Sequence, residues 1–247
     1  MDRVELAIGK EIHALIKRLY PHCRSITGNG VRKTLQILKE FVPMQVNEVP
    51  TGTVAYDWKV PKEWNIRDGY VKNSKGRKII DFKNSNLHVL NYSGPIHKKV
   101  SLKELKEHLY TLPEHPDSIP YVTSYYKENW GFCISYKQYR QLKEDKYEVF
   151  IDSTLTEGSL SYGEILLKGK SKDEVLLTCY TCHPSLCNDN LTGMAILAFL
   201  FRCLSNMELT YSYRFLFIPE TIGSIVWLSR NEDKVANICG LFGFGIY

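Results

Sequence analysis

Glu174-Val-Leu-Leu-Thr-Cys-Tyr-Thr181 is an apolar run of the length of a buried strand, and His183 follows it two residues later. A second run of this kind, Tyr213-Arg-Phe-Leu-Phe-Ile218, is followed by Glu220. An apolar helical pattern covers residues 192–204 between the two runs. A strand, a helix and a second strand in this order predict a crossover unit, whose strands lie parallel in an α/β sheet.

Further apolar runs extend this pattern and predict an α/β core. Pro21 and Pro43 follow two N-terminal stretches that have helix spacing. Strand-like and helical runs alternate again in the C-terminal part of the chain. The strand-like runs lie at residues 147–152, 163–168 and 238–246, and the helical runs at 4–19, 31–41 and 222–228.

The middle of the chain has a different composition. Residues 51–146 are rich in Tyr, Trp, Val, Asn and Gly, and their short β-like runs are separated by turn residues. Residues 101–111 add one short amphipathic helix, with Ser101 as its N-cap. We therefore expect a core domain of residues 1–50 and 147–247, interrupted by a β-rich domain of residues 51–146.

Three side chains that suit metal chemistry follow the strand-like runs of the core. His183 and Glu220 stand just beyond the two quoted runs, and Asp189 lies in a polar stretch before the helical pattern. Reacting groups of open α/β sheets gather at the carboxyl ends of the strands. Because neighbouring strands lie ~4.8 Å apart, these side chains would be within reach of one divalent cation. The sequence thus predicts a metal site with a general base.

Each of these residues also has a structural interpretation. A lone histidine is more often structural than a ligand. Asp189 or Asn190 can serve as a helix N-cap, and Glu220 can be a turn carboxylate or a cap. The predicted convergence of all three favours the metal site over these separate roles.

The cysteines beside His183 open two further alternatives. Cys179-Tyr-Thr-Cys-His183 matches the haem c attachment pattern, but the charged N-terminus does not resemble the signal peptide that export requires. Cys182, His183 and Cys187 could supply a structural zinc site, but no second Cys/His pair stands at suitable spacing. Both alternatives are less favoured than the site with Asp189 and Glu220.

Composition excludes several classes of function. The net charge of +5 over 247 residues is spread along the chain, and no nucleic-acid-binding motif is present. The longest apolar run is far shorter than the ~20 residues of a membrane span. The seven cysteines are odd in number and lie mostly in apolar runs, which is typical of reduced core thiols. We expect a cytoplasmic protein that binds neither membranes nor nucleic acids.

Several long blocks of the sequence resemble one family. The blocks around His183 and Glu220 resemble the bacterial aminopeptidase-like family of unknown function (DUF4910/DUF2172 type), which is similar to M28 zinc aminopeptidases. The resemblance extends over essentially the whole chain. The blocks are Tyr20-Pro-His-Cys-Arg-Ser-Ile-Thr-Gly-Asn-Gly30, Asp57-Trp-Lys-Val-Pro-Lys-Glu-Trp64, Ser85-Asn-Leu-His-Val-Leu-Asn-Tyr92, Pro120-Tyr-Val-Thr-Ser-Tyr-Tyr126, Thr181-Cys-His-Pro-Ser-Leu-Cys-Asn-Asp-Asn-Leu-Thr-Gly193 and Phe215-Leu-Phe-Ile-Pro-Glu-Thr-Ile-Gly223.

This resemblance implies a phosphorylase/hydrolase-like (zinc-peptidase-like) α/β fold, with a mixed sheet core and an inserted β-rich domain. It implies that His183 is a zinc ligand, that Asp189 ligates or bridges metal, and that Glu220 is the general base. The sequence departs from the family pattern at Ser185, where classical members carry the Asp of His-x-Asp, and at Thr221, where they carry a second glutamate. The distal Asp and His ligands would lie beyond residue 247, so a truncated core and one zinc ion rather than two are expected.

The functional hypothesis is a zinc-dependent, aminopeptidase-like hydrolase that acts on peptides or small amide substrates. The alternative is a catalytically degenerate binding protein on a peptidase fold, linked to polysaccharide biosynthesis. Ser185, Thr221 and the early end of the chain favour that alternative. An open terminal strand would invite pairing between copies, so a homo-oligomer is a further expectation.

Overall fold

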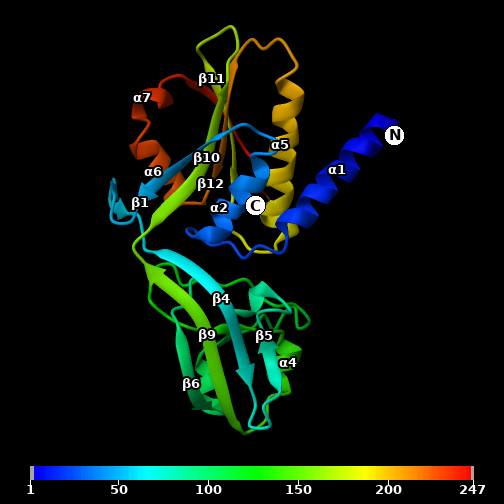
Figure 1. The fold of residues 1–247 in the computed structure, drawn as a ribbon, viewed down its shortest axis with the longest axis vertical. Coiled ribbons are helices and arrows are strands. Elements are labelled where there is room, and N and C mark those ends of the chain that lie inside the picture. Colours follow the sequence, from blue (N-terminus) through cyan, green and yellow to red (C-terminus); the bar gives the residue numbers. More distant parts are fainter. Residues whose placement is uncertain (1–2, 246–247) are drawn as a thin grey trace. The chain divides into compact units, whose positions relative to one another are not determined.

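The computed structural model describes the backbone of residues 3–245 and the side chains of residues 7–245. The described residues form two compact units (Figure 1). The first unit contains the chain up to Glu63 together with the chain from Glu157 onward, and the second unit contains Trp64–Thr156.

A five-stranded mixed sheet forms the centre of the first unit. Its strand order is β1-β10-β12-β11-β13. The central strand β12 pairs in parallel with β11, which pairs in parallel with β13, whereas β1 and β10 run antiparallel to their neighbours. The fold class predicted from the sequence is thus confirmed. The strands are β1 (Gln45–Pro50), β10 (Ser159–Leu167), β11 (Glu174–Tyr180), β12 (Ser212–Ile218) and β13 (Ile238–Gly243).

Helices cover both faces of this sheet. The helices α1 (Arg3–Leu19), α2 (Asn29–Leu38) and α5 (Thr192–Leu204) contribute to one apolar core together with β11 and β12. The helices α6 (Ile222–Ser229) and α7 (Glu232–Val235) lie on the other side of the sheet (Figure 1). Helix α5 is apolar around most of its circumference because it is packed between the sheet and α1. None of the described helices combines the length and the apolar composition that a bilayer crossing demands.

The second unit is built around the four-stranded sheet β5-β4-β9-β6. Its core is formed by side chains such as Val71, Phe132 and Val149, all fully buried. Two short helices, α3 (Leu102–Glu107) and α4 (Tyr136–Arg140), begin at the N-caps Ser101 and Ser135. The strands of the sheet are β4 (Glu63–Lys72), β5 (Lys78–Asp81), β6 (Ile96–Ser101) and β9 (Lys146–Thr156).

The remaining strands and the short helical turns complete the two units. Two-residue strands form the pairs β2 with β3 in the first unit and β7 with β8 in the second. These small pairs contribute little to either sheet. The elements are β2 (Val54–Ala55), β3 (Trp58–Lys59), β7 (Leu109–Tyr110), β8 (Phe132–Cys133), η1 (Asn86–His88) and η2 (Cys187–Leu191).

One local detail differs from the expectations. The run at 147–152 was expected in the core, but it is part of β9 and pairs with β6 in the second unit. The second helix begins after Gly28, which stands at the cap without a side-chain hydrogen bond. The division into a catalytic core and an inserted domain stays a prediction, and the compact units divide at 63/64 and 156/157.

The cysteines are free, as expected of reduced thiols, but they are not all core residues. No disulfide links the seven, all of which lie in the described part of the chain. Cys133, Cys179 and Cys182 are buried, while three others are exposed because they stand on turns, on an outer helix face or on the edge strand. The exposed cysteines are Cys187, Cys203 and Cys239.

Candidate metal centre

The pairing of β11 with β12 determines where the candidate site lies. The two strands are parallel, and their last residues, Tyr180 and Ile218, are register partners. Thr181 donates its backbone N–H to the carbonyl of Ile218 at 3.0 Å, which extends the pairing one step further. The segments that carry His183 and Glu220 therefore leave the sheet side by side.

His183, Asp189 and Glu220 lie close together in the structure. The His183 Nε2 atom is 3.3 Å from Oε1 of Glu220, and its Nδ1 atom is 3.5 Å from Oδ1 of Asp189. The imidazole is buried, and its ring meets Tyr180 edge to face at 5.1 Å between centroids. Each of the two ring nitrogens of the imidazole thus lies near one carboxylate.

Asp189 is positioned by the turn η2, which precedes α5. Helix α5 begins after Leu191, and no side chain caps it, so neither Asp189 nor Asn190 has the capping role considered from the sequence. Asn190 is buried and donates its side-chain amide to the carbonyl of Phe244 at 2.6 Å. The peptide between Asp189 and Asn190 is cis. Asn190 thereby anchors the turn, and Asp189 is left to face the imidazole.

The thiol of Cys182 also belongs to this cluster, although the sequence reasoning set it aside. Ligand atoms of Cys182, His183 and Glu220 all lie within 4.8 Å of one another. The backbone N–H of Glu220 points to the Cys182 sulfur at 3.4 Å. Burial, and next the charge of Glu220, raises the pKa of this thiol well above its usual range. The less favoured alternative with Cys187 is not supported, because that thiol is exposed and outside the cluster.

A buried arginine holds the loop that carries His183. Arg24 is fully buried, and its Nε donates to the backbone carbonyl of His183 at 2.9 Å, while its Nη1 donates to the carbonyl of Leu19 at 2.7 Å. Ser185 adds a second link, from its hydroxyl to the carbonyl of Tyr20 at 2.7 Å. The block of residues 20–30, which the sequence assigned no role at the site, thus supports the loop that carries His183.

The donor atoms of this cluster fit a zinc ion. Imidazole nitrogen, carboxylate oxygen and thiolate sulfur are the ligands that zinc takes in proteins, at ~2.0–2.3 Å. Tetrahedral geometry at these bond lengths separates ligand atoms by ~3.3–3.8 Å. The 3.5 Å between Nδ1 of His183 and Oδ1 of Asp189 agrees with this range, and an ion held by this pair would use that ring nitrogen. Oδ1 of Asp189 is buried and accepts no hydrogen bond from residues 3–245, as a metal ligand would.

A cavity of about 390 Å³ opens beside the cluster. Asp189, Glu220 and Thr221 contribute to its wall. The other lining residues are Thr178, Cys179, Tyr180, Ile218, Ser224, Gly243 and Phe244. A cavity of this size can hold a small organic molecule.

Comparisons with known proteins agree with this fold. Residues 13–245 match the family described as "Domain of unknown function (DUF4910)". A Clostridium acetobutylicum protein named "Putative polysaccharide biosynthesis protein with aminopeptidase-like domain" is 59% identical over 230 residues, which are 93% of this chain and 53% of the relative. This chain therefore spans about half the length of that relative.

Solved structures show the same architecture. The crystal structure of a peptidase named "putative" from Clostridium acetobutylicum is 58% identical, with a TM-score of 0.93 over 95% of this chain and 56% of that chain. A Bacillus subtilis zinc aminopeptidase has a TM-score of 0.60 at 12% identity, over 95% of this chain and 68% of its own. A Shewanella amazonensis peptidase M28 precursor has a TM-score of 0.60 at 10% identity, over 96% of this chain and 72% of its own. At 12% and 10% identity, the last two similarities indicate a shared fold.

Proposed function

This chain belongs to the DUF4910 family, and from that premise we propose that it provides the metal centre of a zinc-dependent, aminopeptidase-like hydrolase of peptide or amide bonds. One observation supports the proposal above all. An imidazole and two carboxylates meet at the carboxyl ends of two parallel strands, beside a cavity. That is where an open α/β sheet places reacting groups.

In this proposal His183 and Asp189 hold one zinc ion, and Glu220 is the general base. Bound zinc supplies Lewis acidity for the scissile carbonyl and acidifies the attacking water. Glu220 would accept a proton from the attacking water at its carboxylate and return it to the leaving amine. Glu220 and Asp189 line the same cavity, so the proposed base and the proposed ligand border the same substrate space. The substrate would be a peptide or a small amide that binds in the adjacent cavity. The protein would act in the cytoplasm.

The substitution Glu220→Gln tests the role of the base. We expect hydrolysis of an aminoacyl p-nitroanilide panel to fall by ~10²–10⁴-fold, the usual contribution of a positioned base. Zinc stoichiometry, measured by elemental analysis, should stay that of the parent chain. Glu208→Gln is the matched control, because Glu208 is exposed and pairs with Lys170 at the surface. Full hydrolysis by the Glu220 variant would reject the assigned role.

A second candidate function is binding without turnover, on a degenerate peptidase fold that acts in polysaccharide biosynthesis. Two observations favour it. Thr221 stands in the cavity wall in place of a glutamate, and the Ser185 hydroxyl is bonded to Tyr20 rather than aimed at the imidazole. A parent chain that binds zinc stoichiometrically but hydrolyses no peptide or amide substrate would favour this candidate over the hydrolase.

A further inference from the structure

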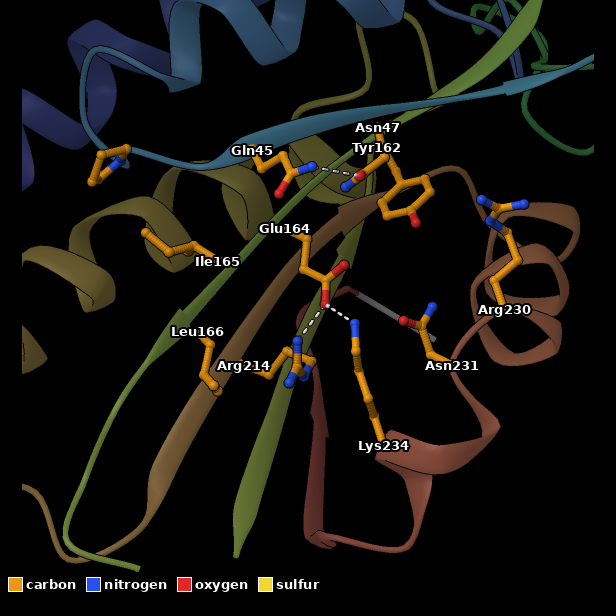
Figure 2. Close-up of a pocket in the computed structure, with 11 residues that line it drawn as sticks. Gln45, Asn47, Tyr162, Glu164, Ile165, Leu166, Arg214, Arg230, Asn231 and Lys234 are labelled. Atoms are coloured by element: carbon orange, nitrogen blue, oxygen red, sulfur yellow. Dashed lines mark hydrogen bonds and ion pairs between the residues drawn. The ribbon is translucent and has the colours of Figure 1, made fainter. Parts of the chain in front are cut away.

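A second and larger pocket lies elsewhere in the first unit. It has a volume of about 510 Å³ and is bordered by β1, β10, β12 and the segment from the end of α6 into α7 (Figure 2). It shares no lining residue with the cavity beside His183. Its chemistry is therefore independent of the proposed hydrolysis.

The strands present an unusual polar surface to this pocket. Gln45 and Asn47 of β1 stand opposite Glu164 and Tyr162 of β10, and register partners lie on the same face of a sheet. A sheet covered by helices on both sides is normally apolar on both faces. Arg214 of β12 adds a charged group to the same pocket. So many polar groups over a covered sheet require a reason other than core packing.

Part of the charge in this pocket is already balanced. Arg214 donates to both oxygens of the Glu174 carboxylate, at 2.6 and 2.8 Å, and it also pairs with Glu164. The Nζ atom of Lys234 lies 3.6 Å from the Glu164 carboxylate. These two carboxylates and two cations sum to zero. Buried ion pairs rarely increase stability over apolar packing, so stability is a weak explanation for this group.

Arg230 adds one positive charge that this group does not balance. It is exposed, it follows α6, and its guanidinium stands at the edge of the pocket near Tyr162 (Figure 2). Burial and the charge of Glu164 raise the pKa of Tyr162, and the charge of Arg230 acts in the opposite direction. With Arg214, Arg230 and Lys234 against Glu164 and Glu174, the pocket carries 3 − 2 = +1.

We propose that this pocket binds a small organic anion, whose oxyanion group lies between Arg230 and Lys234. A guanidinium fork and an ammonium group are the usual partners of phosphoryl and carboxylate oxygens. Asn47, Asn231 and the Tyr162 hydroxyl offer neutral hydrogen-bonding groups to the rest of the ligand. The volume is within the range of small-molecule sites.

Titration of the 247-residue chain with inorganic phosphate, and separately with succinate, tests this proposal at constant ionic strength. The site is observed by NMR through the side-chain N–H resonances of arginine. The Arg230 resonance is assigned as the one that is missing from the spectrum of the Arg230→Gln variant. We expect this signal to shift saturably with at least one of the two anions. The anion that binds more tightly tells whether the site prefers phosphoryl or carboxylate groups.

Three variants determine the outcome. Arg230→Gln and Lys234→Gln should each weaken the affinity at least tenfold, measured by calorimetry. The charge-matched single variant Lys172→Gln should keep the parent affinity, because Lys172 is exposed and outside the pocket. Arg230 is exposed, so its replacement leaves the folded core intact. The proposal is overturned if neither anion saturates the Arg230 signal, or if the pocket variants bind as the parent does.

Discussion

The parallel strands β11 and β12 carry a polar cluster at each end, and the two clusters are of opposite kinds. Near the amino ends, Arg214 is held by the carboxylates of Glu174 and Glu164. Beyond the carboxyl ends, His183 faces two carboxylates at 3.3 and 3.5 Å, longer than a good hydrogen bond. The first cluster contains its own cation. The second contains an excess of acidic groups and adjoins a cavity, which suits a cation from outside.

The largest effect is expected from removing the cation of the first cluster. Arg214→Met leaves Glu174 and Glu164 largely buried without their main partner, so we expect the free energy of unfolding to fall by ~3–5 kcal/mol. Urea unfolding measures this loss. Arg202→Gln is the control, because its pair with Glu11 is about half exposed and should contribute less than ~1 kcal/mol. Equal losses in both variants would contradict the contrast between the clusters.

The second cluster should stabilise the fold only when zinc is present. At ~1,000 times its dissociation constant, zinc should raise the free energy of unfolding by ~4 kcal/mol. His183→Ala should abolish that rise and, without zinc, should cost less stability than Arg214→Met. Unfolding of chelator-treated protein with and without added zinc measures both. His13→Ala, on the exposed side of α1, should respond to zinc as the parent does. A zinc response retained by the His183 variant would place the ion elsewhere.

The smallest effect distinguishes the two ring nitrogens of the His183 imidazole as ligands of the ion. A single imidazole binds one ion through one nitrogen, so the ion lies either on the Asp189 side or on the side of Glu220 and Cys182. We expect Asp189→Asn to lower zinc affinity by more than ~100-fold, and Cys182→Ala by less than ~10-fold, by comparison with outer partners of zinc ligands. Competition with a chromophoric chelator measures both. The reverse order would move the ion to the sulfur side.

The strands and the site loops were predictable because their signals are local. The runs before His183 and Glu220 are apolar and short, and each is followed two residues later by a polar side chain, so β11 and β12 were expected within a residue or two of their observed ends. Their parallel pairing followed from the helix between them. The proximity of His183 and Glu220 then needed only the known spacing of strands. The family resemblance added the fold, which the structure and its relatives confirm.

Other parts of the site could not be predicted, because they depend on contacts between distant segments. Nothing near Arg24 indicates that its guanidinium reaches the carbonyl of His183. Cys182 was weighed only for haem attachment and as a partner of Cys187 in a structural zinc site, and the position of Glu220 beside it makes its sulfur part of the cluster. Strand β1 was missed because Gln45–Pro50 alternates weakly and ends in proline, and its pairing with β10 decides its conformation.

The hydrogen bond from Arg24 to His183 has a consequence for how this protein is made. The two residues are 159 positions apart, and the whole second unit is synthesised between them. A nascent chain therefore exposes an arginine whose acceptor does not yet exist, and the candidate centre cannot assemble until the ribosome has passed β11. Closure of so long a loop is intrinsically slow. The ability to take up metal should thus appear late during translation, after the intervening unit has had time to fold.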